Sequence, residues 1–270
     1  MATGLSVAKP FSLTGHYSAD DLLNLYTVRA SEIFSPPSGV FGKIKKYKYS
    51  YGSEGITRVV KEYFSDSRII NCTTDLLVTS VETSDLYNTF TFTTQKAKMD
   101  YSFNYTLVDV VRATSAAPTF FPVHKIGDRY FVDGGVRSNN PSSLAYDYAV
   151  TKTKETGQDI MMLSLGTGEY IPEPIKPTAY NGLLFWAKNI VDLTTAGQEY
   201  NTHLQVQKYF TGGKPNRYFR FQAKLEEVIP LDEQRPEKLK DLTDLAHETL
   251  EEAYADEDNR MNKLIESLTI

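Results

Sequence analysis

The sequence has 270 residues, of which 41% are hydrophobic and 23% charged, a composition typical of a soluble globular protein that can bury a substantial core. Its net charge of -5 argues against nucleic acid as a partner, and its single cysteine excludes an internal disulfide and a cysteine-rich metal site. No apolar run approaches the roughly 18 residues of a membrane-spanning helix, and the N-terminus shows no signal pattern. We therefore expect a cytoplasmic protein.

The first hundred residues alternate predicted helices and strands. Apolar residues recur at helical spacing after Ser18, a good N-cap, and the prolines at Pro36 and Pro37 end that run. Lysine and tyrosine alternate over residues 43–51, which favours a solvated loop; contact with anionic lipid headgroups is the alternative. In chain order we predict helices over 18–33 and 55–64, strands over 75–84 and 87–93, and a helix over 107–113.

The segment Tyr130–Gly135, which reads Y-F-V-D-G-G, is the most informative stretch of the chain. Its first three residues favour a strand, and Gly134 and Gly135 allow backbone angles that a side chain would forbid. Asp133 would then lie at the carboxyl end of a strand, where open α/β sheets bind their ligands. The alternative is an aspartate that only caps a tight turn.

The remaining sequence predicts helices around one further strand. Asn140 and Pro141 suit the N-cap and first position of a helix, and Trp186 lies on a periodic apolar stretch that we assign to the core. We predict a helix over 141–154, a buried strand over 159–165, a helix over 183–207 and amphipathic helices over 233–268. The alternation of strands and helices predicts a layered α/β fold with a largely parallel sheet.

Three motifs in succession resemble those of the patatin-like phospholipases, specifically the bacterial members. They are A-T-S-A-A-P-T-F-F-P over 113–122, F-V-D-G-G-V-R-S-N-N-P over 131–141 and S-L-G-T-G over 164–168. The resemblance implies a three-layer sandwich with a mostly parallel central sheet, and a late strand over 217–221. We expect one patatin-like domain over residues 1–225, with a C-terminal helical segment over 226–270 packed on it.

The resemblance also implies a role for the D-G-G motif. In this family its aspartate is one half of a Ser-Asp catalytic dyad, so Asp133 would be the catalytic base, with Gly134 and Gly135 as motif support. The serine of a G-x-S-x-G elbow is absent from this sequence, since Gly4–Ala8, Gly52–Gly55 and Gly166–Gly168 all fail the pattern. Ser6, inside the first of these, is expected to be an ordinary helix-end residue.

We therefore expect an N-terminally truncated member that lacks the oxyanion loop, the elbow and the first strands of the sheet. Exposed strand edges would then make the chain prone to aggregation. The implied function is hydrolysis of phospholipid or other lipid acyl esters, with transient membrane contact and without a cofactor. As given, the chain should be inactive. The alternative is a degenerate patatin domain that acts as a binding or regulatory module.

Two further residue types carry no catalytic expectation. The four histidines are scattered, and His124, which lies close to the D-G-G strand, is expected to be structural or at the surface. Cys72 ends an apolar run, so a buried, inert thiol is expected. No metal-ligand spacing is present in the sequence.

Overall fold

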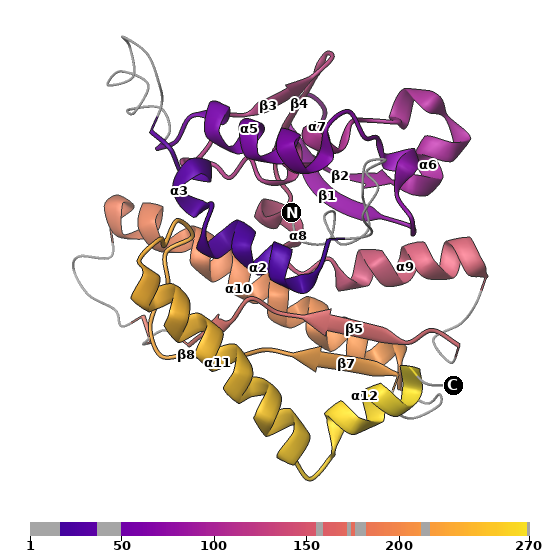
Figure 1. Cartoon of the computed structure of the whole chain (residues 1–270), viewed down its shortest axis with the longest axis vertical. Coiled ribbons are helices and arrows are strands. Elements are labelled where there is room, and N and C mark those ends of the chain that lie inside the picture. Colours follow the sequence, from indigo (N-terminus) through magenta and orange to yellow (C-terminus); the bar gives the residue numbers. More distant parts are fainter. Residues whose placement is uncertain are drawn as a thin grey trace. The chain divides into compact units, whose positions relative to one another are not determined.

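The computed structural model describes residues 17–36, 50–154, 159–171, 174–175, 182–211 and 217–268. Its internal contacts divide the chain into two compact units, residues 1–139 and 140–270, which are described separately below (Figure 1). Both units mix helices and strands, which confirms the α/β class. The division into a domain over 1–225 and a segment over 226–270 stays a prediction.

The helices of unit 1 form where the sequence places caps and apolar stripes. Ser18 and Asp21 make a capping box before α2, and the side chain of Thr106 caps α7. The predicted helix over 18–33 is split in two, because Val28 and Arg29 leave the helical pattern between α2 and α3. The helices are α2 (Ala19–Thr27), α3 (Ala30–Ile33), α5 (Ser53–Phe64), α6 (Thr94–Met99), α7 (Leu107–Thr114) and α8 (Gly135–Ser138), with short 3-10 turns at Ile69–Asn71 and Tyr101–Phe103.

The sheet of unit 1 has four strands in the order β2-β1-β4-β3, and every neighbouring pair is antiparallel. The strands are β1 (Leu77–Glu82), β2 (Asn88–Thr93), β3 (His124–Ile126) and β4 (Arg129–Asp133). This corrects the prediction of one mostly parallel central sheet. For two of the pairs the physical reason is the short connection, because a two-residue turn at Gly127 and Asp128 joins β3 to β4 and residues 83–87 join β1 to β2, whereas parallel strands need a long crossover. The β1–β4 pair joins segments far apart in the chain.

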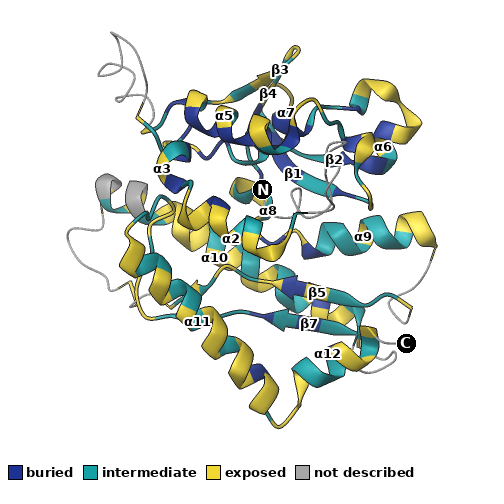
Figure 2. Ribbon diagram, in the orientation of Figure 1, coloured by how far each residue is buried: buried dark blue, intermediate teal, exposed yellow. Residues whose placement is uncertain are grey.

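The core of unit 1 lies between this sheet and helices α5 and α7 (Figure 2). Four apolar residues at helical spacing give α5 its buried stripe, namely Ile56, Val59, Val60 and Phe64. On the sheet side, the ring of Phe131 packs against Phe90 and Phe92 at centroid distances of 5.3 and 5.4 Å. Phe131 is fully buried, so the strand that ends at Asp133 is anchored in the core two residues before the carboxylate.

Unit 2 contains two small parallel sheets and four helices within its described residues. The strands are β5 (Met162–Leu165), paired with β7 (Tyr218–Phe221), and β6 (Glu169–Tyr170), paired with β8 (Lys224–Leu225). The helices are α9 (Ser142–Thr153), α10 (Leu183–Tyr209), α11 (Pro236–Ala255) and α12 (Arg260–Leu268). The predicted helices and the late strand over 217–221 are thus confirmed. The predicted N-cap is wrong by one residue, because Pro141 still lies outside the helical conformation and takes the N-cap position; Asn140, before it, accepts a hydrogen bond from Ser142 N.

Packing in unit 2 is sparser than the sequence predicts. Its hydrophobic cluster consists of Phe219 and Phe221 of β7 with Ala253 and Leu264 of the C-terminal helices. The predicted buried strand is wrong in its burial, because Leu163 and Leu165 are 47% and 70% exposed. Trp186 is also not a core residue, since it is 38% exposed on α10.

A polar network joins the elements of unit 2. Arg220 of β7 donates to Ser164 Oγ at 2.8 Å and forms an ion pair with Glu199 of α10. Ser164 Oγ lies 3.1 Å from Ser142 Oγ of α9, and both serines are buried. These contacts satisfy the buried face of β5, whose one buried side chain is a serine.

Candidate functional site

Asp133 is the last residue of β4, as the sequence predicts, and its backbone is fixed on both sides. In the sheet it pairs with Ser80 of β1, and its N–H donates to the carbonyl of Ala116 at 3.0 Å. Ser80 Oγ donates to the carbonyls of Val132 and Ala113, at 2.7 and 3.1 Å. The strand end is therefore bonded to the A-T-S-A-A-P segment, which brings two of the three sequence motifs together.

The first glycine after Asp133, Gly134, is required for space rather than for a backbone angle. Gly134 has φ -63° and ψ -27°, and neither glycine has a positive φ, which corrects the sequence-based reason for them. A Cβ on Gly134 would lie 2.3 Å from the carbonyl oxygen of Thr79 and 2.5 Å from its hydroxyl. The chain after Asp133 thus passes against β1 at a distance that only glycine permits.

The carboxylate of Asp133 is held by its own turn. Its Oδ1 accepts a hydrogen bond of 2.7 Å from Gly135 N–H at the start of α8. Burial raises the pKa of Asp133 above its ordinary value, and the Gly135 N–H opposes that rise by stabilising the carboxylate. A partly buried carboxylate with a raised pKa is suited to accept a proton from a neighbouring hydroxyl.

Sequence reasoning missed Thr79, and it quoted Ala116 within the A-T-S-A-A-P motif without a role; both residues position this turn. Neither contact could be found locally, because each joins residues far apart in the chain. The tight approach of Gly134 to Thr79 could have been found only by knowing that β1 and β4 are neighbours.

Other candidate residues have structural partners. His124 Nε2 lies 3.1 Å from Asp109 Oδ1, and His203 Nδ1 lies 3.0 Å from the hydroxyl of Tyr218. Gly166–Gly168 forms the turn between β5 and β6, and Ser53 begins α5. Ser6, His16, residues 43–49 and the Gly212–Pro215 segment lie outside the described residues.

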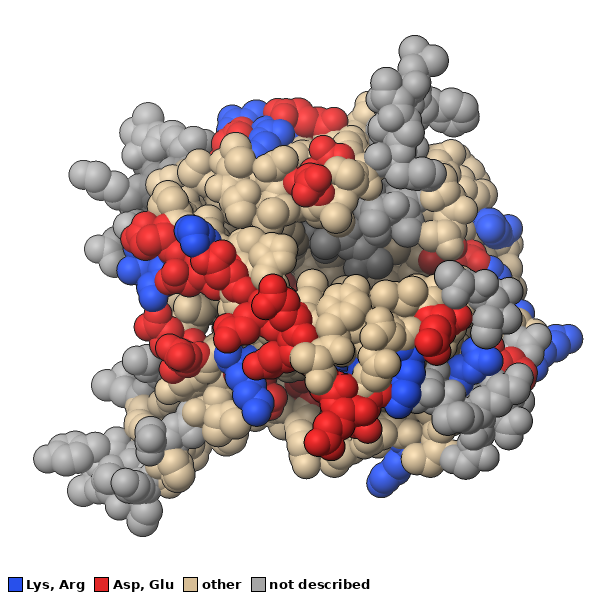
Figure 3. All heavy atoms as spheres, turned by 60° about the horizontal axis from the view of Figure 1, so that its bottom comes forward, with Lys and Arg blue, Asp and Glu red and all other residues tan. Residues whose placement is uncertain are grey.

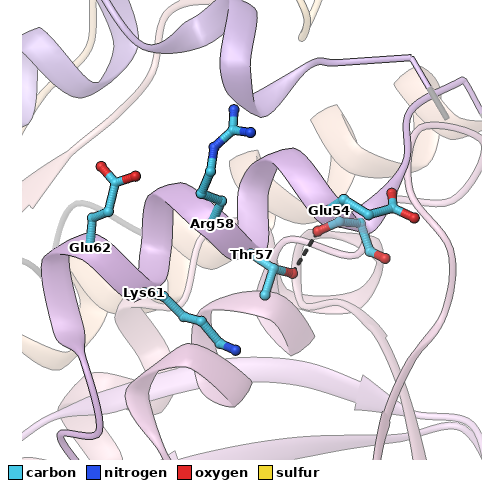
Figure 4. A pocket seen from close by; sticks show the side chains of 6 residues that line it. Glu54, Thr57, Arg58, Lys61 and Glu62 are labelled. Carbon is cyan, nitrogen blue, oxygen red and sulfur yellow. Dashed lines mark hydrogen bonds between the residues drawn. The ribbon is translucent and has the colours of Figure 1, made fainter. Parts of the chain in front are cut away.

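A groove of about 580 Å³ runs along α5 (Figure 4). It is lined by Ser53, Glu54, Thr57, Arg58, Lys61 and Glu62. Two of the charged residues are already engaged in ion pairs, Arg58 with Glu32 at 3.2 Å and Glu62 with Arg29 at 2.6 Å. Thr57 donates to the carbonyl of Ser53 within the helix (Figure 4). The groove is therefore a weaker candidate for catalysis than the Asp133 corner.

Neither metal nor thiol chemistry is indicated in the described part of the chain. Among the described residues, no group of three or more His, Cys, Asp or Glu side chains is placed so that it could hold a metal ion. Cys72 is half-buried rather than fully buried, and burial raises the pKa of its thiol to about 11, so the thiolate is scarce near neutral pH. No described helix combines the length and apolar character needed to cross a membrane.

Comparison with known proteins decides the family. The profile described as "Patatin-like phospholipase" matches residues 1–146, more than half of the chain. The chain belongs to the patatin-like phospholipase family. The matched region of this patatin-like protein includes Asp133, both glycines and the A-T-S-A-A-P segment.

Individual relatives agree with this assignment. Calcium-independent phospholipase A2-gamma of Oryctolagus cuniculus is 34% identical over 138 residues, which are 51% of this chain and 17% of that protein. Patatin-like protein 1 of Arabidopsis thaliana is 25% identical over 199 residues, 63% of this chain and 48% of that protein. Patatin-07 of Solanum tuberosum is 25% identical over 230 residues, 76% of this chain and 58% of that protein. The patatin-like chain thus spans only a small part of the mammalian relative and about half of the plant ones.

Proposed function

We propose that this patatin-like chain carries the base of a serine acyl hydrolase that cleaves phospholipids or other lipid acyl esters. The family and the names of the relatives support a lipid acyl hydrolase. The observation that carries the residue assignment is the Asp133 carboxylate, partly buried at the end of β4 with a raised pKa and a fixed orientation.

In the proposed reaction Asp133 takes the proton of a serine hydroxyl as its oxygen attacks the ester carbonyl. Collapse of the tetrahedral intermediate expels the alcohol portion of the lipid, which receives that proton, and leaves an acyl-enzyme. Attack by water, again with Asp133 as base, releases the fatty acid. Gly134 and Gly135 support this role by fixing the turn that aims the carboxylate.

The serine of the proposed dyad does not come from a G-x-S-x-G elbow within the sequence, since no such pattern occurs in it. Among the described residues, the hydrogen-bond partner of the Asp133 carboxylate is the Gly135 N–H, and no hydroxyl contacts it. We propose that the nucleophile and the oxyanion-binding loop are contributed by polypeptide outside residues 1–270, and that these residues alone are inactive.

The same observation favours a second candidate, a non-catalytic patatin domain that binds a partner or regulates another protein. A carboxylate without a hydroxyl partner can serve as a turn cap, with Gly135 N–H as its ligand. The two candidates differ in whether residues 1–270 can support ester hydrolysis when an elbow is supplied.

The test is hydrolysis of a p-nitrophenyl ester by two purified proteins. One consists of residues 1–270, and the other carries a patatin glycine-rich loop and G-x-S-x-G elbow joined before residue 1. We expect turnover and fluorophosphonate labelling only in the second protein. Fluorophosphonate-sensitive turnover by residues 1–270 themselves would contradict the proposal of an external serine. An extended protein that folds but neither turns over nor labels would support the binding module.

We further propose a cytoplasmic protein that contacts membranes transiently. Figure 3 shows Asp and Glu side chains gathered on the face that comes forward from the bottom of Figure 1, where α11 and α12 lie. The exposed acidic residues of α11 are Glu237, Asp241, Asp244, Glu248, Glu251 and Glu252. Because anionic headgroups repel such a surface, lipid contact is expected through another part of the molecule.

A further inference from the structure

Arg112 of α7 is a buried cation to which the proposed mechanism gives no role. The residue is only 2% exposed, and its Nε and Nη1 atoms are buried without a hydrogen-bond partner among the described residues. Buried guanidinium groups are normally paired, because each unsatisfied buried donor loses the hydrogen bonds that it makes with water. The Nε and Nη1 donors of Arg112 therefore lack hydrogen-bond acceptors, which a bound ligand could supply.

The surroundings of Arg112 are aromatic rather than acidic. Its guanidinium carbon lies 5.8 Å from the ring centroid of Phe121, and that ring packs against Phe34 and Tyr51, each at 5.9 Å. Burial lowers the pKa of Arg112 to about 10, and the exposed Glu54 raises it less. The side chain thus stays charged at neutral pH beside rings that attract a cation only weakly.

Other arginines in the described part of the chain that stack on rings or lie buried have a carboxylate partner. Arg129 lies 5.2 Å from the ring centroid of Phe90 and pairs with Glu82 at 3.6 Å. Arg220 pairs with Glu199 and also donates to Ser164. Arg112 has the aromatic contact of Arg129 and burial like that of Arg220, but not their carboxylate.

The turn that carries Phe121 is strained. Thr119 has φ +73°, a left-handed conformation that is unfavourable for a β-branched residue. The backbone N–H groups of Phe120 and Phe121 both donate to the carbonyl of Ala117, at 3.1 and 2.9 Å. Strain of this kind persists only where neighbouring structure enforces it, here the N–H groups of Ser50 and Tyr51, which donate to the carbonyls of Thr119 and Phe120 at 2.8 Å. Such strained segments cluster at ligand clamps and switch regions.

We propose that Arg112 binds a carboxylate attached to an apolar chain, such as a fatty acid, and that the turn at residues 119–121 moves to admit it. A carboxylate supplies planar oxygen acceptors for guanidinium N–H groups and balances the single charge. The aromatic rings of Phe121, Phe34 and Tyr51 favour an aliphatic tail over a polar one. The site is independent of catalysis and stands even if Asp133 is only a turn residue.

The test is calorimetric titration of residues 1–270 with sodium octanoate. Octanol, which lacks the charge, and N-acetylglutamate, which presents a carboxylate as a protein side chain does, are the comparison ligands. We expect saturable binding of octanoate with one site and no binding of octanol. Binding of N-acetylglutamate as tight as that of octanoate would overturn the free fatty acid in favour of a polypeptide carboxylate. Absence of octanoate binding to the folded protein would overturn the site.

Substitutions of Arg112 test whether this residue binds the octanoate carboxylate. Arg112→Met should weaken octanoate binding about 50-fold, the loss expected for a charge-assisted hydrogen bond. Arg112→Lys keeps the charge but not the planar donors, so binding should weaken about tenfold; this variant decides the question if Arg112→Met fails to fold. Arg129→Met is the matched control and should bind as the wild type does. Unchanged binding in Arg112→Lys, or an equal loss in Arg129→Met, would overturn the assignment.

Discussion

The two units of the molecule bury their apolar residues to very different extents. In unit 1 the sheet and helices α5 and α7 enclose one large core, and Phe131 in the middle of β4 is fully buried. Among the described residues of unit 2 the hydrophobic cluster is small, and Leu165 at the end of β5 is 70% exposed. Both strands precede a glycine turn that belongs to a family motif, yet only β4 is anchored by packing.

This difference in packing indicates which of the two motifs can hold a catalytic side chain in a fixed orientation. Catalytic groups need orientation to within a fraction of an ångström, which packed and hydrogen-bonded neighbours provide. Asp133 has these neighbours in Ser80, Ala116 and Gly135. The S-L-G-T-G turn after β5 is held chiefly by a polar network on one face. We therefore expect substitutions around β4 to cost more stability than equivalent ones around β5.

The largest expected effect comes from emptying the core beneath Asp133. Phe131→Ala removes a fully buried ring that contacts Phe90 and Phe92, and it should lower the free energy of unfolding by about 3–5 kcal/mol. Leu165→Ala, at an exposed position in unit 2, is the matched control and should change it by less than about 0.5 kcal/mol. Denaturant unfolding measures the free energy of unfolding of both variants. Equal losses would show that β4 is no better anchored by packing than β5.

A smaller loss is expected when a methyl group is added after Asp133. Gly134→Ala places a Cβ 2.3 Å from the Thr79 carbonyl, and the required shift should cost about 1–3 kcal/mol. Gly197→Ala in the middle of α10 has no atom within 4 Å of the added Cβ, so it should stabilise the protein by up to about 1 kcal/mol through helix propensity. Thermal unfolding compares the two variants. A Gly134→Ala protein as stable as the wild type would remove the spatial reason for this glycine.

Removal of the buried charge should have an effect that depends on pH. Burial raises the pKa of Asp133 above 3.8 in the folded state, so the stability linked to this group is present below pH 3.8 and is lost as pH rises through the folded pKa. Asp133→Asn should therefore be more stable than the wild type at pH 7, by about 1 kcal/mol. The difference should shrink as the pH falls from 7 through the folded pKa and should be absent below 3.8. A difference that is the same at pH 7 and pH 3 would show that burial does not disfavour the carboxylate.

The smallest effect on stability is expected on the exposed face of β5. Replacing Leu163 and Leu165 together with threonine should alter the free energy of unfolding by less than about 0.5 kcal/mol. The same change should reduce self-association of residues 1–270, because exposed apolar strands promote pairing between chains. Light scattering at matched concentrations checks this prediction. Self-association that is not reduced in this variant would show that the chains associate through a surface other than β5.

Local sequence signals predicted most elements of the fold. Periodic apolar residues predicted α5 and α7, and the aromatic run before Asp133 predicted β4 and its end. Ser18 also caps a helix as its residue type suggests, whereas Asn140 lies one residue before the N-cap of α9. These features depend on neighbours within a few residues, so the chain itself carries the information.

Long-range pairing could not be predicted in the same way. The antiparallel order β2-β1-β4-β3, the contact of Gly134 with Thr79 and the burial of Arg112 all depend on segments far apart in the sequence. Arginine is usually exposed, so the letters around Arg112 gave no sign of a buried charge. The exposure of Leu163 and Leu165 was missed because an apolar strand resembles a buried one until its neighbours are known.

The central claim is that Asp133 is the catalytic base of a serine hydrolase. The most direct measurement is kcat/KM for a p-nitrophenyl ester, taken on the protein that carries a patatin elbow joined before residue 1, with aspartate or asparagine at position 133. Asparagine keeps the shape of the side chain but cannot accept the serine proton, so kcat/KM should fall by at least about 1,000-fold while the protein stays folded and the serine is still present. An asparagine variant that retains full activity would contradict the claim and leave Asp133 as a residue of the turn alone.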